Sequence, residues 1–167
     1  MFLINGNYKT YVKEEISNDE FLTLIGTFGA IGNGFSRFLW NVLFNKTGYK
    51  FVMLLNIFLC IIVLGTIRFT IDVDPILYLF MVFVMNCCLG GYLVITPTFS
   101  QLVFGQETGS NVYGFYWETY SIANFIQFAF VSGLNDKIGF ENIIYICMGM
   151  CVLSIPLVIT TTWQGPW

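Results

Sequence analysis

The chain has 167 residues, of which 56% are hydrophobic and 10% are charged, and its formal net charge is −3. Soluble domains carry about 25% charged residues, and a chain of this length cannot enclose so much apolar surface in one core. The composition therefore predicts an integral membrane protein, and the negative charge argues against binding to nucleic acid.

A polar segment, residues 1–18, precedes the first apolar run. Its apolar start ends at Ile4, and acidic side chains follow at Glu14 and Glu15. A secretory signal has a basic start and an apolar region of about 7–15 residues, so this segment does not read as one. We expect any targeting sequence to be absent or to lie inside the first spanning helix.

Five apolar segments follow and predict a single transmembrane helical domain over residues 19–163, with a short tail at 164–167. A spanning helix needs about 20 residues. The predicted fold class is an all-α membrane protein with about five transmembrane helices, and short loops should make consecutive helices antiparallel neighbours. The predicted spans cover approximately residues 21–44, 51–69, 75–104, 112–134 and 142–163.

Local signals mark the ends and interruptions of these helices. Ser17, Asn18 or Asp19 can cap the first helix, and Pro75 is favoured in the first turn of the third. Pro97 lies late in the third span and should kink it or end its regular part.

Small residues recur at helical spacing, which lets helices approach closely in lipid. The pattern indicates ordinary helix packing, or else a substrate path lined by small residues. The residues are Gly26, Ala30 and Gly34 in the first span, with Gly90 and Gly91 in the third.

The cysteines all fall inside apolar runs, so we expect them to be packing residues rather than a disulfide framework. The chain has no histidine to complete a mixed zinc site, and we expect neither a metal nor a cofactor. The cysteines are Cys60, Cys87, Cys88, Cys147 and Cys151.

Two charges lie within the predicted spans. Arg37 is costly in a membrane unless it is paired or hydrated, which makes it a candidate for function. Its structural alternatives are an ion pair, or snorkelling to the interface near Lys46. Glu118 would pair with Arg37 or with a partner chain, or would carry a proton in a coupled transporter.

Amides also lie at membrane depth, at Asn33, Asn41, Asn86, Asn124 and Gln127. We expect them to bond across helices, in preference to a role in a substrate site. The candidate substrate-binding residues are nevertheless Arg37, Glu118 and Asn33.

Residues 32–40 (GNGFSRFLW) and 45–50 (NKTGYK) resemble the major facilitator superfamily of transporters, around the short cytoplasmic loop of each six-helix half. The family pattern there is a glycine, an aspartate four residues later, a base, and then glycine and further bases. This loop motif has Asn41 in place of the glycine and Asn45 in place of the aspartate, while Lys46, Gly48 and Lys50 match. A neutral amide loses the charge-assisted bond of the aspartate, which is roughly twice as strong as a neutral one.

Later motifs resemble the C-terminal half of the oxalate/formate antiporter-like branch of that family. They are Thr96-Pro97-Thr98, Phe104-Gly105, Gly109, Tyr113-Gly114 and residues 136–139 (DKIG).

The resemblance implies that the five helices correspond to the last five of twelve, with the first seven absent. It also implies that Arg37 is a carboxylate-binding cation. Related carriers of dicarboxylates would place a second base on the fourth of these helices, but no Lys or Arg occurs between Phe115 and Leu134. A clamp of two cations therefore cannot be built from this chain.

Two hypotheses for function follow. The first is a non-catalytic integral-membrane subunit, a truncated transporter-like bundle that is an accessory or structural component of a larger complex. A respiratory-chain complex of the mitochondrial inner membrane is one such host. The second is part of a secondary transporter for a small organic anion (a carboxylate), completed by a partner chain or by homo-oligomerisation.

The expected partners are the lipid bilayer and other membrane subunits that cover the Arg37 face. An enzyme is not expected, because the chain has no histidine, no carboxylate pair within a span, no nucleotide-binding loop and no set of metal ligands.

Overall fold

The computed structural model is all-helical, as predicted, and it describes residues 6, 9, 12 and 18–161. Most of the predicted N-terminal segment, the end of the fifth span and the tail at 164–167 lie outside the described residues. The long helices are α2 (Asp19–Thr47), α3 (Tyr49–Val73), α4 (Pro75–Phe104) and α5 (Gln106–Thr160).

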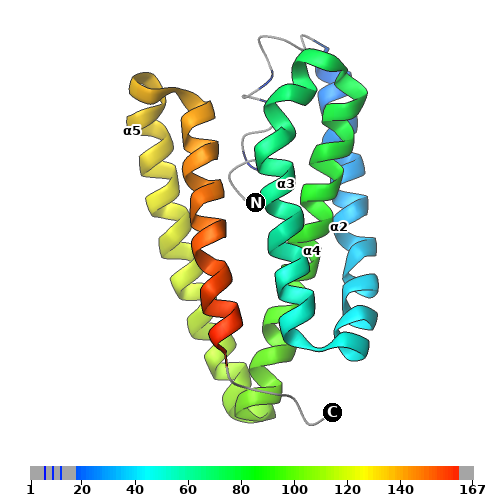
Figure 1. Cartoon of the computed structure of the whole chain (residues 1–167), viewed down its shortest axis with the longest axis vertical. Helices are drawn as coiled ribbons and strands as arrows, with labels where there is room; N and C mark the ends of the chain where they lie inside the picture. The colour runs from blue at the N-terminus through cyan, green and yellow to red at the C-terminus, as the bar shows by residue number, and fades with distance from the viewer. Residues whose placement is uncertain (1–5, 7–8, 10–11, 13–17, 162–167) are drawn as a thin grey trace.

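Helix α5 is divided at Gly139, where the backbone is not helical. We call residues 106–138 the first arm and residues 140–160 the second arm. The two arms form a hairpin that lies beside α2, α3 and α4 (Figure 1). Helices α2 and α4 run in the same direction, because α3 returns the chain between them.

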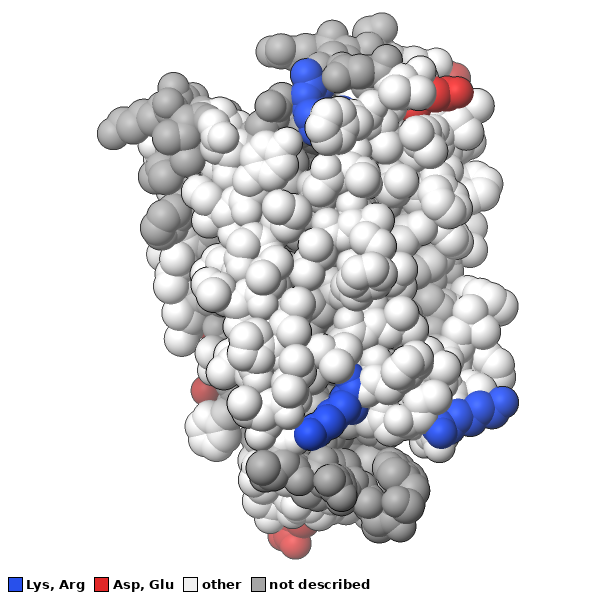
Figure 2. All heavy atoms as spheres, viewed as in Figure 1, with Lys and Arg blue, Asp and Glu red and all other residues white. Residues whose placement is uncertain are grey.

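Three segments of the described residues are long and apolar enough to cross a membrane: Tyr49–Ile71, Pro75–Phe104 and Asn142–Thr160. They agree with the predicted integral membrane protein. On the face drawn in Figure 2, charged side chains gather towards the two ends and uncharged residues cover the middle. Helix α2 and the first arm of α5 do not meet the same standard of apolarity, because polar residues interrupt them.

Single glycines make three of the four one-residue turns between the helical segments, and Asp74 makes the other. Gly48 has φ 79° and ψ 173°, Gly105 has φ 80° and ψ 167°, and Gly139 has φ 76° and ψ 153°. This backbone region is essentially open to glycine alone. Helix α2 thus continues to Thr47 and α3 begins at Tyr49, so the connections are much shorter than the predicted loops.

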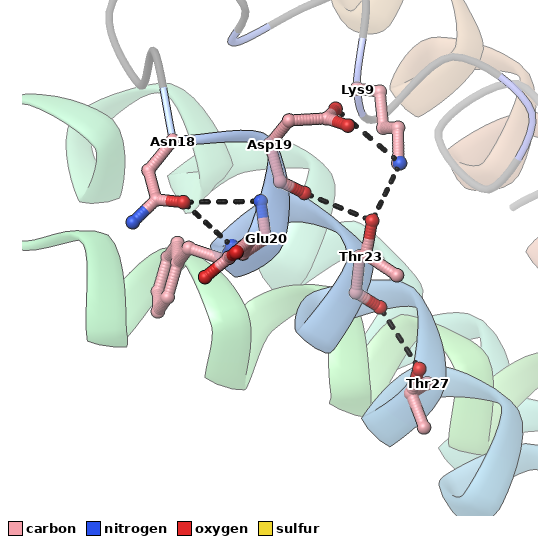
Figure 3. Close-up of polar contacts among 7 residues, drawn as sticks. Lys9, Asn18, Asp19, Glu20, Thr23 and Thr27 are labelled. Carbon is pink, nitrogen blue, oxygen red and sulfur yellow. Dashed lines mark hydrogen bonds and ion pairs between the residues drawn. The ribbon is translucent and has the colours of Figure 1, made fainter.

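Side-chain caps begin two of the helices. The Asn18 side chain accepts hydrogen bonds from the backbone N–H groups of Glu20 (3.1 Å) and Phe21 (3.2 Å), which confirms one of the three predicted caps (Figure 3). Asp74 accepts from the N–H of Ile76 at 2.7 Å and precedes Pro75, which takes the predicted first position of α4.

Lys9 connects the N-terminal segment to the start of α2. Its Nζ lies 3.6 Å from the Asp19 carboxylate and donates to the Thr23 hydroxyl at 3.0 Å (Figure 3). An exposed pair of this kind contributes at most about 1 kcal/mol. The contact holds the Lys9 side chain beside the first turn of α2 and adds little to stability.

Prolines do not end the helices that contain them. Helix α4 continues through Pro97 to Phe104, and α5 continues through Pro156 to Thr160. Of the two predicted effects of Pro97, an end to the regular part of its helix is therefore wrong, and a kink stays a prediction. In lipid, neighbouring helices and hydroxyl side chains can satisfy the backbone groups that a proline frees.

Helix α2 packs mainly on α4, through a stripe of buried residues spaced three or four apart. Gly90 and Gly91 on α4 make this approach possible, as predicted. A Cβ at Gly90 would collide with the Ser36 hydroxyl, and one at Gly91 would lie 2.7 Å from the Trp40 ring. The buried stripe of α2 is Leu22, Ile25, Gly29, Gly32, Ser36, Trp40 and Phe44.

The predicted small-residue stripe of α2 is not the one that packs. Gly34 is exposed and a Cβ there would have no neighbour within 4 Å, whereas Gly29 and Gly32 touch Asn86 and Phe83 of α4. The two sets lie on different faces of the helix: Ala30 follows Gly29 by one residue and Gly34 follows Gly32 by two, which at 3.6 residues per turn rotates them by about 100° and 200°. Spacing alone does not say which face is used.

The main core lies between α3 and α4 and includes residues from α2 and the second arm of α5. Cys60 and Cys88 are buried in it, and Cys147 and Cys151 pack against it. All five cysteines are free thiols, and the four that contact this core are packing residues, as predicted. No group of three or more metal-ligating side chains occurs in the described part of the chain.

Candidate functional site

Helix α2 exposes two different faces beside the one that packs on α4. One is apolar and bulky, with Phe28, Ile31, Phe35, Phe38 and Leu39 exposed. The other is small and polar, and we call it the polar strip. Its members are exposed and lie on one side of the helix at its 3.6-residue period: Thr23, Thr27, Ala30, Gly34, Arg37 and Asn41.

Arg37 and Asn33, both predicted site residues, are in contact. The Nε and Nη2 atoms of Arg37 donate to the Asn33 amide oxygen, at 3.2 Å and 3.0 Å. This bond links residues one turn apart and holds the guanidinium along the helix. A guanidinium has five N–H donors, so Asn33 satisfies only part of it and the remaining donors are available to an acceptor outside α2.

Glu118, the third predicted site residue, lies exposed on the first arm of α5. Within the described residues no salt bridge joins it to Arg37, and the recorded ion pair is that of Lys9 with Asp19. Helix α2 and the first arm each pack on α4. The predicted pairing of Glu118 with Arg37 is therefore not made inside one chain.

Both charges lie far from the ends of their helices. Helix α2 ends and α5 begins at the same end of the bundle, the lower one in Figure 1. Arg37 is ten residues before Thr47, and Glu118 is twelve residues after Gln106. At 1.5 Å per residue, these positions are about 15 and 18 Å from that end. In a helix that crosses a hydrocarbon core about 30 Å thick, a charge at either position would lie inside the core.

Hydrogen bonds to two successive carbonyls of α4 tie the bundle together. Ser36 and Trp40 of α2 both donate to the Cys87 carbonyl, at 3.0 Å and 2.9 Å. Asn56 of α3 donates to the Cys88 carbonyl at 2.9 Å. Sequence reasoning missed these residues. Gly90 and Gly91 were a signal, since a helix exposes its backbone carbonyls where it has no side chains.

The amides behave differently from the prediction. The side chains of Asn86 and Asn124 donate to the carbonyls of Val82 and Tyr120, one turn earlier on the same helix. They therefore do not make the expected bonds across helices. Asn56, which sequence reasoning did not single out, makes one. A hydrogen bond from a side-chain amide to a carbonyl of the same helix can form without a neighbouring helix.

The loop-motif residues have structural positions. Asn41, Asn45 and Lys46 are exposed, and Gly48 makes the turn between α2 and α3. Lys50 donates from Nζ to the Ile159 carbonyl at 3.2 Å. That carbonyl belongs to the last turn of α5, where a cation is favoured by unsatisfied backbone groups and by the helix dipole.

Aromatic rings fill the contact between α4 and the first arm of α5. Trp117 and Tyr120 meet edge to face with ring centroids 5.1 Å apart, and Tyr92 lies 5.9 Å from Tyr116. The rings leave no space there for a water molecule. This cluster is therefore a packing contact, although its ring types would suit a ligand cage.

An open hollow of about 270 Å³ lies at the surface between α2 and α4. It is almost wholly apolar and does not include Arg37. Its lining is Ser36, Leu39, Trp40, Leu43 and Cys87.

No family model matches this chain. No curated protein and no solved structure matches it either. The resemblance to major facilitator transporters therefore stays a prediction from the sequence. The site must be interpreted from its own residues, of which Arg37 on α2 and Glu118 on α5 are the most informative.

Proposed function

We propose that this chain is a non-catalytic subunit of a membrane protein complex, crossing the bilayer five times and covered by protein along α2 and the first arm of α5. The observation that carries the proposal is the position of Arg37 and Glu118. Each is exposed, each would lie inside the hydrocarbon core of a membrane that its helix crosses, and the structure records no ion pair for either among the described residues.

The energetic argument is direct. A charged side chain facing lipid at the centre of a spanning helix costs roughly 2.5–3.5 kcal/mol on insertion scales. Helix α2 has 29 residues and would be about 43 Å long, which is enough to span. A helix of sufficient length that is too polar for lipid is best explained by a neighbouring protein.

The two helices that fall short of the apolarity of a lipid-facing span are also the two that carry these charges. The three other segments, α3, α4 and the second arm, are apolar enough to face lipid. This division supports a subunit with one side towards lipid and another towards a partner. The proposed host, a respiratory-chain complex of the mitochondrial inner membrane, rests on the chain's small size and its predicted spans.

Native electrophoresis after extraction in a mild detergent tests the proposal. We expect the chain to migrate in an assembly well above the mass of its 167 residues, and Arg37→Leu to release it at lower detergent concentration than the matched variant Phe38→Leu on the apolar face. Migration of the unaltered protein as a stable monomer would contradict the proposal.

Transport of a small carboxylate is the second candidate. It is favoured by the exposed guanidinium of Arg37, held by Asn33 with donors to spare. Its test is uptake of a labelled dicarboxylate by proteoliposomes that contain the chain together with whatever copurifies with it. Uptake that is lost in Arg37→Gln would establish this function in place of the first.

A further inference from the structure

We propose that the protein that covers α2 and the first arm of α5 is a second copy of the chain, with Arg37 of each copy bound to Glu118 of the other. The proposal rests on the proposed function and deepens it by naming the partner. Its basis is charge complementarity: one exposed cation and one exposed anion, on two helices of the same bundle, without an ion pair inside the described chain.

The chemistry of the two groups is matched. Asn33 accepts from Nε and Nη2 of Arg37, and no other hydrogen bond of the guanidinium is recorded among the described residues. A carboxylate can accept two parallel N–H bonds from a guanidinium, which is the strongest form of this contact. A phospholipid phosphate is a poor substitute, because it lies at the membrane surface and Arg37 is about 15 Å from the end of α2.

The depths of the groups allow a symmetric dimer. A two-fold axis along the membrane normal keeps every residue at its own depth, so the two members of a pair must lie at similar heights. Arg37 is about 15 Å from the lower end of α2, and Glu118 is about 18 Å from the lower end of α5. In Figure 1 the α4–α5 turn lies somewhat below the α2–α3 turn, and the long arginine side chain spans such a difference. The interface would be isologous, with two identical ion pairs.

Small residues lie on one side of each charge, which lets helices approach closely there. Gly34 lies one turn from Arg37, and Gly114 lies one turn from Glu118. A Cβ added at either glycine would have no neighbour within 4 Å in the monomer. Ser121, on the other side of Glu118, is also small and exposed. These residues make one side of each charge shallow, whereas Phe115 and Ile122 flank Glu118 on its other side.

Charge exchange between copies tests the pairing. Two differently tagged forms of the full chain are coexpressed in one membrane, and the fraction that copurifies is measured in mild detergent. Arg37→Glu alone and Glu118→Arg alone should each lower self-association at least about tenfold, because each places like charges face to face in both pairs.

Coexpression of the Arg37→Glu chain with the Glu118→Arg chain should restore association, because every pair is then again one cation and one anion. The doubly exchanged single chain should also restore it. Restoration by the double variant but not by coexpression would show that the pair forms within one chain and would overturn the proposal. Restoration by neither would overturn it as well.

The coexpression and double-exchange experiments also control for misfolding, since a variant that cannot fold cannot be rescued by its complement. If the unaltered chain binds other proteins but never a second copy, this proposal fails while the proposed function stands. If it binds nothing, both fail.

Cross-linking checks the geometry independently. Gly34→Cys and Ser121→Cys place thiols one turn from the two charges, towards the same end of the bundle. We expect rapid cross-linking between chains that carry one variant each, above the background of the native cysteines. Gly149→Cys, on the exposed side of the second arm, is the control, and cross-linking no faster than this control would count against the proposed face.

Discussion

At the scale of single residues, the contact between α2 and α4 depends on the absence of side chains at Gly90 and Gly91. With no side chains there, Ser36 and Trp40 reach the Cys87 carbonyl directly. Bonds of this kind are worth about 1 kcal/mol each in membranes. Most of the contact energy must therefore come from the close packing that the glycines permit.

Gly90→Ala is expected to destabilise the protein by about 1–3 kcal/mol, the usual cost of overpacking. The new Cβ would occupy the place of the Ser36 hydroxyl and press on the Asn33 carbonyl. Denaturation by increasing SDS in mixed micelles measures the loss. Gly149→Ala, where a Cβ meets nothing within 4 Å, should be neutral or slightly stabilising. Equal stability of the two variants would contradict this account of the contact.

At the candidate site, the sequence predicts which residues are charged within the spans, but not which groups they contact. Arg37 and Glu118 are recognisable because charge in an apolar segment is rare. That Asn33 holds Arg37 follows from their separation by one turn, but it was not predicted. The absence of a pair between Arg37 and Glu118 inside the chain depends on how α2 and α5 are placed around α4, which local sequence does not encode.

At the scale of helices, the glycine turns explain why the predicted loops are so short in the structure. Hydropathy locates the apolar centres of helices well, because those centres must match the solvent. It locates ends poorly, since polar residues such as Lys46 and Thr47 can still be helical. The sequence of α5 likewise marked two spans, and only the backbone shows that one residue, Gly139, separates them.

Gly105→Ala isolates the backbone contribution of such a turn. A Cβ there has open space around it, so the only penalty is the positive φ of 80°. Strain in this region costs about 1–3 kcal/mol, and the variant should unfold at a correspondingly lower SDS fraction. Gly149→Ala again serves as the control, since its backbone is helical. A loss no greater than in the control would mean that the turn relaxes at no cost.

At the scale of the whole molecule, five crossings remain a proposal, because only three segments of the described residues are apolar enough to be recognised by composition. The other two would cross because of their length and their protein contacts. The all-helical fold was predictable from the sequence, while the number of crossings depends on tertiary contacts such as that of Trp40 with α4.

Labelling from one side of sealed vesicles distinguishes these cases. Single cysteines at Asn18 and Asp74 should react from one side, and cysteines at Asn45 and Glu107 from the other, because successive helices reverse direction. An impermeant maleimide reports each position before and after the vesicles are opened. If α2 lies on the surface and does not cross, Asn18→Cys and Asn45→Cys will react from the same side.

The parallel contact of α2 with α4 has a consequence for biosynthesis. Helix α2 leaves the ribosome first, yet the carbonyl that receives Ser36 and Trp40 belongs to Cys87, which is translated about fifty residues later. Until then α2, which falls short of the apolarity of the three recognised spans, has no α4 to pack on. A nascent chain that stops at Thr47 should therefore insert poorly, and one that extends through Phe104 should carry α2 into the membrane with it.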